Sequence, residues 1–166
     1  MQLTDSTVLG TPSRSDDTLT REVRTAAEAT FATHDAIQLA TLGGPYTPWI
    51  LGAYFTHRAS ERGIDLFLMV EKHGKTMVNL VADPRVAFAV NQGDAARDFL
   101  QGNGQAEILP EAEGERVVAA LVQKMPWFKL YTPCAPVRIS LGELFVTSFA
   151  RGWMPAKRLD FRGDLR

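Results

Sequence analysis

Apolar and polar residues follow two different periods along this chain, and the changes of period mark the expected helices and strands. An amphipathic helix over residues 19–34 is predicted by apolar residues at helical spacing behind the capping candidates Asp17 and Thr18. The apolar positions are Leu19, Val23, Ala26, Ala27, Thr30 and Phe31. Short runs of β-branched and aromatic residues then predict strands at 36–42, 47–56, 64–70, 86–91, 99–109, and 137–142 continuing through 144–150.

Brief helices separate some of these strands. A short helix follows Lys75 and is stopped by Pro84, and a second lies between Pro110 and Pro126. The second helix carries one apolar stripe, formed by Val117, Val118, Leu121, Val122 and Met125. A doubly wound parallel sheet would need a long helix after nearly every strand. The pattern therefore predicts a mainly β (α+β) fold, an antiparallel barrel of six to seven strands with an N-terminal helix and short peripheral helices.

Turn and glycine positions refine this fold. The segment 43–45 (Gly-Gly-Pro) predicts the turn between the first two strands, and Gly102 and Gly104 predict a bulge or a close backbone approach in the fifth. Residues 1–17 are rich in Ser, Thr and Asp without periodicity, so we expect a flexible arm followed by one domain over residues 18–166.

Composition narrows the function. The formal net charge is -1, so no global field favours nucleic acid or an anionic membrane. No signal pattern or membrane-spanning apolar run is visible, and the single cysteine, Cys134, excludes an internal disulfide, so we expect a cytoplasmic protein. No residue stands out as a catalytic acid or base, and the histidine spacing gives a metal site little support.

The strongest chemical signal is the turn after the third strand. The strand at 66–70 delivers Lys72, His73 and Lys75 to a helix start, where free amide groups favour an anion such as phosphate and Thr76 adds a hydroxyl. The rival interpretation is a solvated turn whose lysines keep the protein soluble. A P-loop is excluded because Met69 stands where its first glycine is required.

The order of these segments resembles the FMN-binding split barrel of the pyridoxamine 5'-phosphate oxidase superfamily over residues 19–150. The most specific parts are Asn79-Leu80, the segment 83–86 (Asp-Pro-Arg-Val) and the strand at 104–107 (Gly-Gln-Ala-Glu). Family members commonly carry Ser-Arg-Lys before the helix, where this chain has Gly74-Lys75-Thr76.

The resemblance implies a homodimer that holds FMN at its interface and acts as an oxidoreductase on a small organic substrate. The second strand would line the isoalloxazine edge, the end of the third would approach the ribityl chain, and the tail would complete the site across the dimer. The implied residues are Trp49, Ile50, Leu51 and Gly52 in the second strand, Leu68 and Met69 in the third, and Trp153 and Arg158 in the tail. Asp160 stands where the oxidases have a histidine.

Two alternatives remain open. One is the same barrel binding haem or a deazaflavin, with His73 as a candidate ligand to iron; a phosphate contact or an ordinary surface position are the other interpretations of His73. The second is a binding module for a flavin or a phosphorylated metabolite that performs no chemistry, which the replacement of a basic residue by Thr76 favours.

Overall fold

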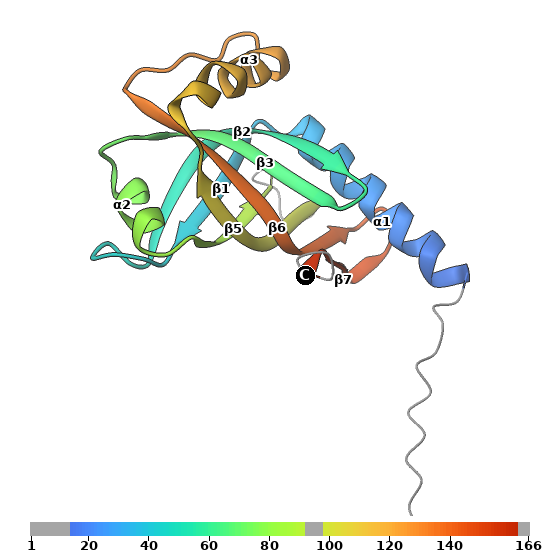
Figure 1. The fold of residues 1–166 in the computed structure, drawn as a ribbon. Coiled ribbons are helices and arrows are strands. Elements are labelled where there is room, and N and C mark those ends of the chain that lie inside the picture. The colour runs from blue at the N-terminus through green and yellow to red at the C-terminus, as the bar shows by residue number, and fades with distance from the viewer. Residues whose placement is uncertain (1–13, 92–97, 163–166) are drawn as a thin grey trace, which may run out of the picture.

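The computed structural model describes residues 14–91 and 98–162, which form one antiparallel sheet with three helices packed around it. Figure 1 shows α1 and α2 on opposite sides of the view with the strands between them. The elements are α1 (Arg14–Thr33), β1 (Ala36–Thr41), β2 (Trp49–Ser60), β3 (Gly63–Glu71), α2 (Lys75–Ala82), β4 (Arg85–Val90), β5 (Phe99–Ile108), the 3-10 turn η1 (Glu111–Glu113), α3 (Gly114–Lys124), β6 (Cys134–Ser148) and β7 (Trp153–Asp160).

The strands close into a barrel. Their order is β3-β2-β1-β4-β5-β6-β7, and a further pairing between β3 and β6 joins the ends of the first six. Strand β7 pairs with β6 and lies outside the closed ring. The predicted mainly β barrel is therefore confirmed, and closure removes most of the exposed strand edges that an open sheet would present.

The barrel is split between β2 and β3. These strands pair from Phe55↔Leu68 to Ser60↔Gly63. Before Phe55, β2 pairs with β1 alone, through Trp49↔Thr41 to Tyr54↔Ala36, and beyond Leu68, β3 pairs with β6 alone. Within the described residues, the edge of β2 from Trp49 to Tyr54 therefore has no partner strand on its β3 side.

The interior is filled by alternate residues of every strand, together with one face of α1 and of α2. In β1, Ile37, Leu39 and Thr41 are fully buried while their neighbours face outward. At the end of α1, the Phe31 ring meets Phe55 edge-on, with the centroids 5.9 Å apart. Burial of this apolar surface is the main favourable term in folding, because each large side chain contributes about 1.5–3 kcal/mol.

Helix α3 packs on the outside of the barrel. Most of its predicted apolar stripe is confirmed, since Val117, Leu121 and Met125 form a second apolar cluster with Phe67 and Phe128, whereas Val122 is exposed. The lysine at its end, Lys124, ties it to the rest of the chain by donating hydrogen bonds to backbone carbonyls of α1, the following loop and β2. These acceptors are Phe31 (2.9 Å), His34 and Phe55 (3.0 Å).

The two ends of the chain differ from expectation. Helix α1 begins at Arg14, so residues 14–17 are helical and only part of the expected arm, residues 1–13, lies outside the described residues. The basic composition of the sequence from Arg151 onward predicts a tail that contacts a partner rather than one that packs in the core. Instead this segment forms strand β7, and Trp153 is 7% exposed and packs in the core. Composition failed here because few side chains of a short outer strand need to be buried.

The predicted bulge in β5 is confirmed. The register with β6 shifts between Asn103 and Gly104, and a methyl group at Gly102 would lie 2.6 Å from both the Glu143 carbonyl and the Phe88 ring. Replacing Gly102 by alanine should therefore lower the free energy of unfolding by about 1–3 kcal/mol, because the strand or the ring must move.

Urea unfolding measures this effect, and Gly114→Ala is the matched control. A methyl group at Gly114 meets nothing within 4 Å, and the residue is helical, so that variant should gain about 0.5–1 kcal/mol. Equal stability of the two variants would contradict the close approach at Gly102.

Candidate functional site

The backbone amides at the start of α2 have no acceptor within the helix. Its N-cap residue, Gly74, makes no side-chain capping bond, and the first intrahelical bond runs from the Val78 N–H to the Gly74 carbonyl. The preceding helical amides, of Lys75, Thr76 and Met77, have no carbonyl one turn earlier to accept from them. Together with the helix dipole they form a positive site that suits an anion.

Lys75 adds a full charge to this site. Its ammonium lies 4.3 Å from the centroid of the Trp49 ring and 5.4 Å from that of Tyr46. No carboxylate of the described residues lies within ion-pair distance of it. Cation–π contact restricts the side chain without neutralising it, so the charge of Lys75 remains available to an anion.

A buried amide holds the loop that carries Tyr46. The Asn79 side chain is fully buried and donates to the Thr41 hydroxyl (3.0 Å) and to the Tyr46 carbonyl (2.9 Å). Its Oδ1 is buried without a hydrogen-bond partner among the described residues. The Asn79-Leu80 pair of the sequence resemblance thus has a physical role, since Asn79 joins α2 to β1 and to the loop before β2.

Acidic groups offset part of the positive charge. The Lys72 ammonium lies 2.8 Å from a Glu111 carboxylate oxygen, and the hydrogen bond from Lys72 lowers the pKa of Glu111. The Glu71 carboxylate lies near Gly74, where a methyl group would be 3.2 Å from its Oε2. Of the two predicted lysines, Lys75 is therefore the one whose charge is not already paired within the described residues.

The open edge of β2 lies close to the same helix. Trp49 contributes to the Lys75 site, Ile50 is 67% exposed, and a side chain at Gly52 would meet nothing within 4 Å. At the end of this edge the Tyr54 ring packs against Trp127, with centroids 5.0 Å apart. Free backbone groups, open space and aromatic faces therefore occur side by side at the split.

Solved structures share this architecture. A haem-binding protein from Mycobacterium smegmatis superposes with a TM-score of 0.62 at 19% identity, over 94% of this chain and 61% of that one. A protein assigned as a pyridoxamine 5'-phosphate oxidase, from Listeria innocua, gives 0.59 at 18% identity over 77% and 97%. The haem storage protein HutZ from Vibrio cholerae gives 0.59 at 18% over 75% and 94%.

The chain has the pyridoxamine 5'-phosphate oxidase-like split-barrel fold. No protein-family model matches the sequence, and no curated protein does. The superpositions establish the fold. Because the sequence identities are below one fifth, they leave the ligand of this split barrel open.

Several of the remaining predicted residues lie at the split, with different exposures. His73 is exposed in the turn, which suits each of its three interpretations. Met69 is half-buried against the cluster under α3. Leu68 is fully buried in the core and Thr76 is 3% exposed, so their side chains offer little surface to a ligand. Leu51 is half-buried on the inner face of the open edge.

Trp153 and Arg158 do not join this group within one chain. Both belong to β7, which Figure 1 shows on the other side of the molecule from α2. The Trp153 ring is in the core, and Arg158 forms ion pairs with Glu143 and Asp160.

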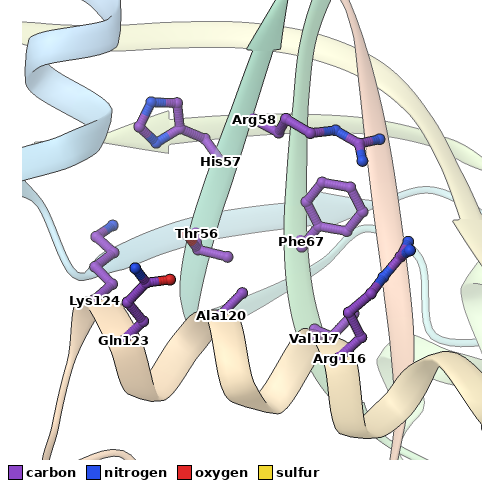
Figure 2. A pocket seen from close by; sticks show the side chains of 9 residues that line it. All are labelled: Thr56, His57, Arg58, Phe67, Arg116, Val117, Ala120, Gln123 and Lys124. Carbon is purple, nitrogen blue, oxygen red and sulfur yellow. The ribbon is translucent and has the colours of Figure 1, made fainter.

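Two cavities lie away from α2. One, of about 530 Å³, lies between α3 and strands β2 and β3, and Figure 2 shows its side chains. The other, of about 400 Å³, involves α1, the β2–β3 turn and β7, and includes Arg158. Sequence reasoning missed both cavities and also Tyr46, since no local motif connects segments so far apart in the chain.

Two further properties concern metals and membranes. Within residues 14–91 and 98–162, no group of three or more His, Cys, Asp or Glu side chains is placed to hold a metal ion. No helix in these ranges combines the length and the apolar character needed to cross a bilayer.

The ion pairs that Arg158 and Arg162 form with Asp160 should make the stability of the protein depend on pH. Hydrogen bonds from Arg162, with a further contribution from the Arg158 charge, lower the pKa of Asp160 from 3.8 to about 2. A depressed carboxyl pKa stabilises the folded chain above the unfolded-state value, and the contribution is lost as the pH falls through the folded-state value. Asp160→Asn should therefore destabilise the protein most at neutral pH, and the difference should shrink between pH 4 and about 2.

Thermal unfolding of both proteins at pH 7, 4 and 2 measures the difference at low salt. Glu115→Gln, which removes an exposed carboxylate of α3, controls for the change in net charge. A difference between wild type and Asp160→Asn that stays constant with pH would contradict the ion-pair assignment.

Proposed function

We propose that this protein binds FMN at the split of the barrel, at a homodimer interface, and acts as an oxidoreductase on a small organic molecule. The observation that carries the proposal is made on the described residues alone: an uncapped helix start, a Lys75 ammonium without an ion-pair partner and an open strand edge coincide. A flavin ester has a dianionic phosphate, a polar chain and a flat ring with hydrogen-bonding edges. Each part of such a cofactor meets a matching feature of the split.

The residues present fit this group. The α2 amides and Lys75 would hold the phosphate by charge-assisted hydrogen bonds. The free backbone groups of β2 between Trp49 and Gly52 would hydrogen-bond to the ring edge, and Tyr54 with Trp127 would exclude water. The flavin, when bound, supplies the electron and hydride chemistry. The protein's contribution is then to bind, orient and shield, which agrees with the lack of an evident catalytic acid or base in the sequence.

The carboxylates of Glu71 and Glu111 lie near the start of α2 and oppose the binding of a phosphate there. Glu71 is exposed, so its carboxylate can turn towards solvent when a phosphate arrives. Glu111 is exposed as well, and Lys72 could exchange it for the phosphate, because a surface ion pair contributes only about 0–1 kcal/mol. Lys75 needs no such exchange.

The homodimer is supported by an uncharged outer face. Gln38, Ala40, Gly52, Ala87 and Ala89 face away from the core on the neighbouring strands β1, β2 and β4. An exposed sheet face of small, uncharged side chains is typical of a surface that is covered in the assembled protein. Such a dimer would also allow Arg158 of the partner subunit to approach the split.

A haem-binding function is the second candidate. Two of the solved structures with this fold are described as a haem-binding and a haem storage protein, and His73 is exposed at the split. A deazaflavin would use the flavin site itself. A binding module for a phosphorylated metabolite, without chemistry, needs only the α2 start. A cytoplasmic location and the lack of nucleic-acid and membrane partners remain expectations from the sequence.

Lys75→Ala should weaken FMN binding by about 1–3 kcal/mol, the scale of one charge-assisted hydrogen bond. Fluorescence quenching of FMN measures the dissociation constant. Arg21→Ala, at an exposed position of α1, is the control for the lost charge and should bind like the wild type. Unchanged affinity in Lys75→Ala would remove the phosphate assignment.

The visible spectrum of the freshly purified protein separates the candidates. A flavin band supports FMN, a deazaflavin absorbs at shorter wavelength, and a Soret band that disappears in His73→Ala supports haem. A colourless protein whose melting temperature does not rise with FMN would favour the metabolite-binding module.

Ala87→Arg should convert the dimer to a monomer, because a charge would be buried without a partner at the centre of the uncharged face. Sedimentation velocity measures the mass of each form. Glu115→Arg, on the exposed face of α3, serves as the control and should leave the dimer intact. A wild-type protein that is monomeric at all concentrations would contradict the proposed assembly.

A further inference from the structure

We propose that the cavity between α3 and strands β2 and β3 is a second binding site, for a small organic anion with a flat apolar body, such as an aromatic carboxylate. The site is separate from the split of the barrel, since none of its lining residues belongs to the predicted flavin site. The proposal therefore goes beyond the flavin function and does not depend on it.

The cavity has the size of a ligand site. Its volume is about 530 Å³, which falls in the usual range of about 300–1,000 Å³ for small-molecule pockets. Figure 2 shows its side chains converging from three elements. They are Thr56, His57 and Arg58 from β2, Phe67 from β3, and Arg116, Val117, Ala120, Gln123 and Lys124 from α3.

The floor of the cavity is apolar and flat. Phe67 and Val117 belong to the cluster that joins α3 to the barrel, and the small side chain of Ala120 lines the cavity with them. A planar hydrocarbon body would lie on the Phe67 ring and remove apolar surface of both partners from water.

Two arginines provide the anion-binding end. The Arg58 guanidinium lies 5.2 Å from the centroid of the Phe67 ring, and Figure 2 shows Arg116 extending from α3 towards the same end of the cavity. No lining residue is acidic. Two guanidinium groups from different elements can each donate to one carboxylate, which is the geometry that arginine supports best.

The ion pairs these arginines already make are weak. Arg58 lies 3.5 Å from an Asp65 oxygen, and Arg116 lies 2.8 Å from a Glu113 oxygen. The side chains of both arginines are more than half exposed, 59% and 70% respectively. Solvent screens such pairs strongly, so a ligand carboxylate held by both cations competes with them at small cost.

The other end of the cavity, formed by His57, Gln123 and Lys124, is polar, but the charge of Lys124 is already engaged by other groups. The Lys124 ammonium is occupied by three backbone carbonyls and by the Phe55 ring, whose centroid is 4.0 Å away. Burial and the charge of Lys124 lower the pKa of His57, which favours its neutral imidazole. This asymmetry orients the ligand, with its anionic group at the arginines and any neutral polar substituent at His57 and Gln123.

The test uses 1-naphthoate as the probe and its neutral amide, 1-naphthamide, as the chemical control. Isothermal titration and amide chemical shifts should show 1-naphthoate bound with a dissociation constant on the order of 1 mM or below, with shifts in β2, β3 and α3. The amide, which has the same body without the charge, should bind about tenfold more weakly or worse.

Two variants test the site itself. Arg58→Gln with Arg116→Gln should weaken 1-naphthoate by about tenfold or more, while the exposed pair Arg21→Gln with Arg62→Gln, which removes the same total charge, should leave binding unchanged. Ala120→Phe should block binding by filling the cavity with no change in charge. The arginine variants lie at the surface and keep the test valid if Ala120→Phe unfolds.

Three results would overturn the proposal. These are equal affinity for the acid and the amide, undiminished binding in the double arginine variant, and no binding of 1-naphthoate at millimolar concentration to the folded wild-type protein.

Discussion

The pairing of β3 with two different strands is the constraint on which the rest of this structure depends. Strand β3 pairs with β6 from Asp65 to its end at Glu71, but it pairs with β2 only from Gly63 to Leu68. Beyond Leu68, β2 and β6 diverge, so β3 can form hydrogen bonds with only one of them. It pairs with β6, and the barrel is therefore closed through β6 and open beside β2. The open edge of β2, which lies beside the start of α2, follows from this geometry.

The same constraint decides which cations can act. Lys72 lies on the β6 side of the turn and meets Glu111, whereas Lys75 lies on the split side and meets only the rings of Trp49 and Tyr46 among the described residues. Aromatic contact fixes the position of an ammonium and leaves its field in place, so less entropy is lost when an anion binds. Two lysines that are equivalent in the sequence therefore differ in chemistry because of where the barrel opens.

The sequence predicted most of the fold, because buried faces impose a period on it. The strands from β1 to β6 and most of the stripe of α3 were found within a few residues, and Lys75 and Trp49, which were assigned to one cofactor site, lie side by side. Strand β7 was not found, since an outer strand buries few side chains and shows no clear alternation. The bond from Asn79 to Tyr46 spans 33 residues and has no local signature. Long-range contacts of this kind, which also create the cavity under α3, cannot be inferred from spacing.

A net charge of -1 conceals two local concentrations of positive charge that differ in kind. At the split, one ammonium joins backbone amides, and amides stabilise an anion only when it can sit against the helix start. Under α3, two guanidinium groups border an apolar floor, where a hydrogen-bonded headgroup gains from a hydrocarbon body beside it. A free phosphate therefore suits the first site better than the second, and an aromatic carboxylate has the opposite preference. The two proposed sites would therefore select different anions, and neither would depend on the total charge of the chain.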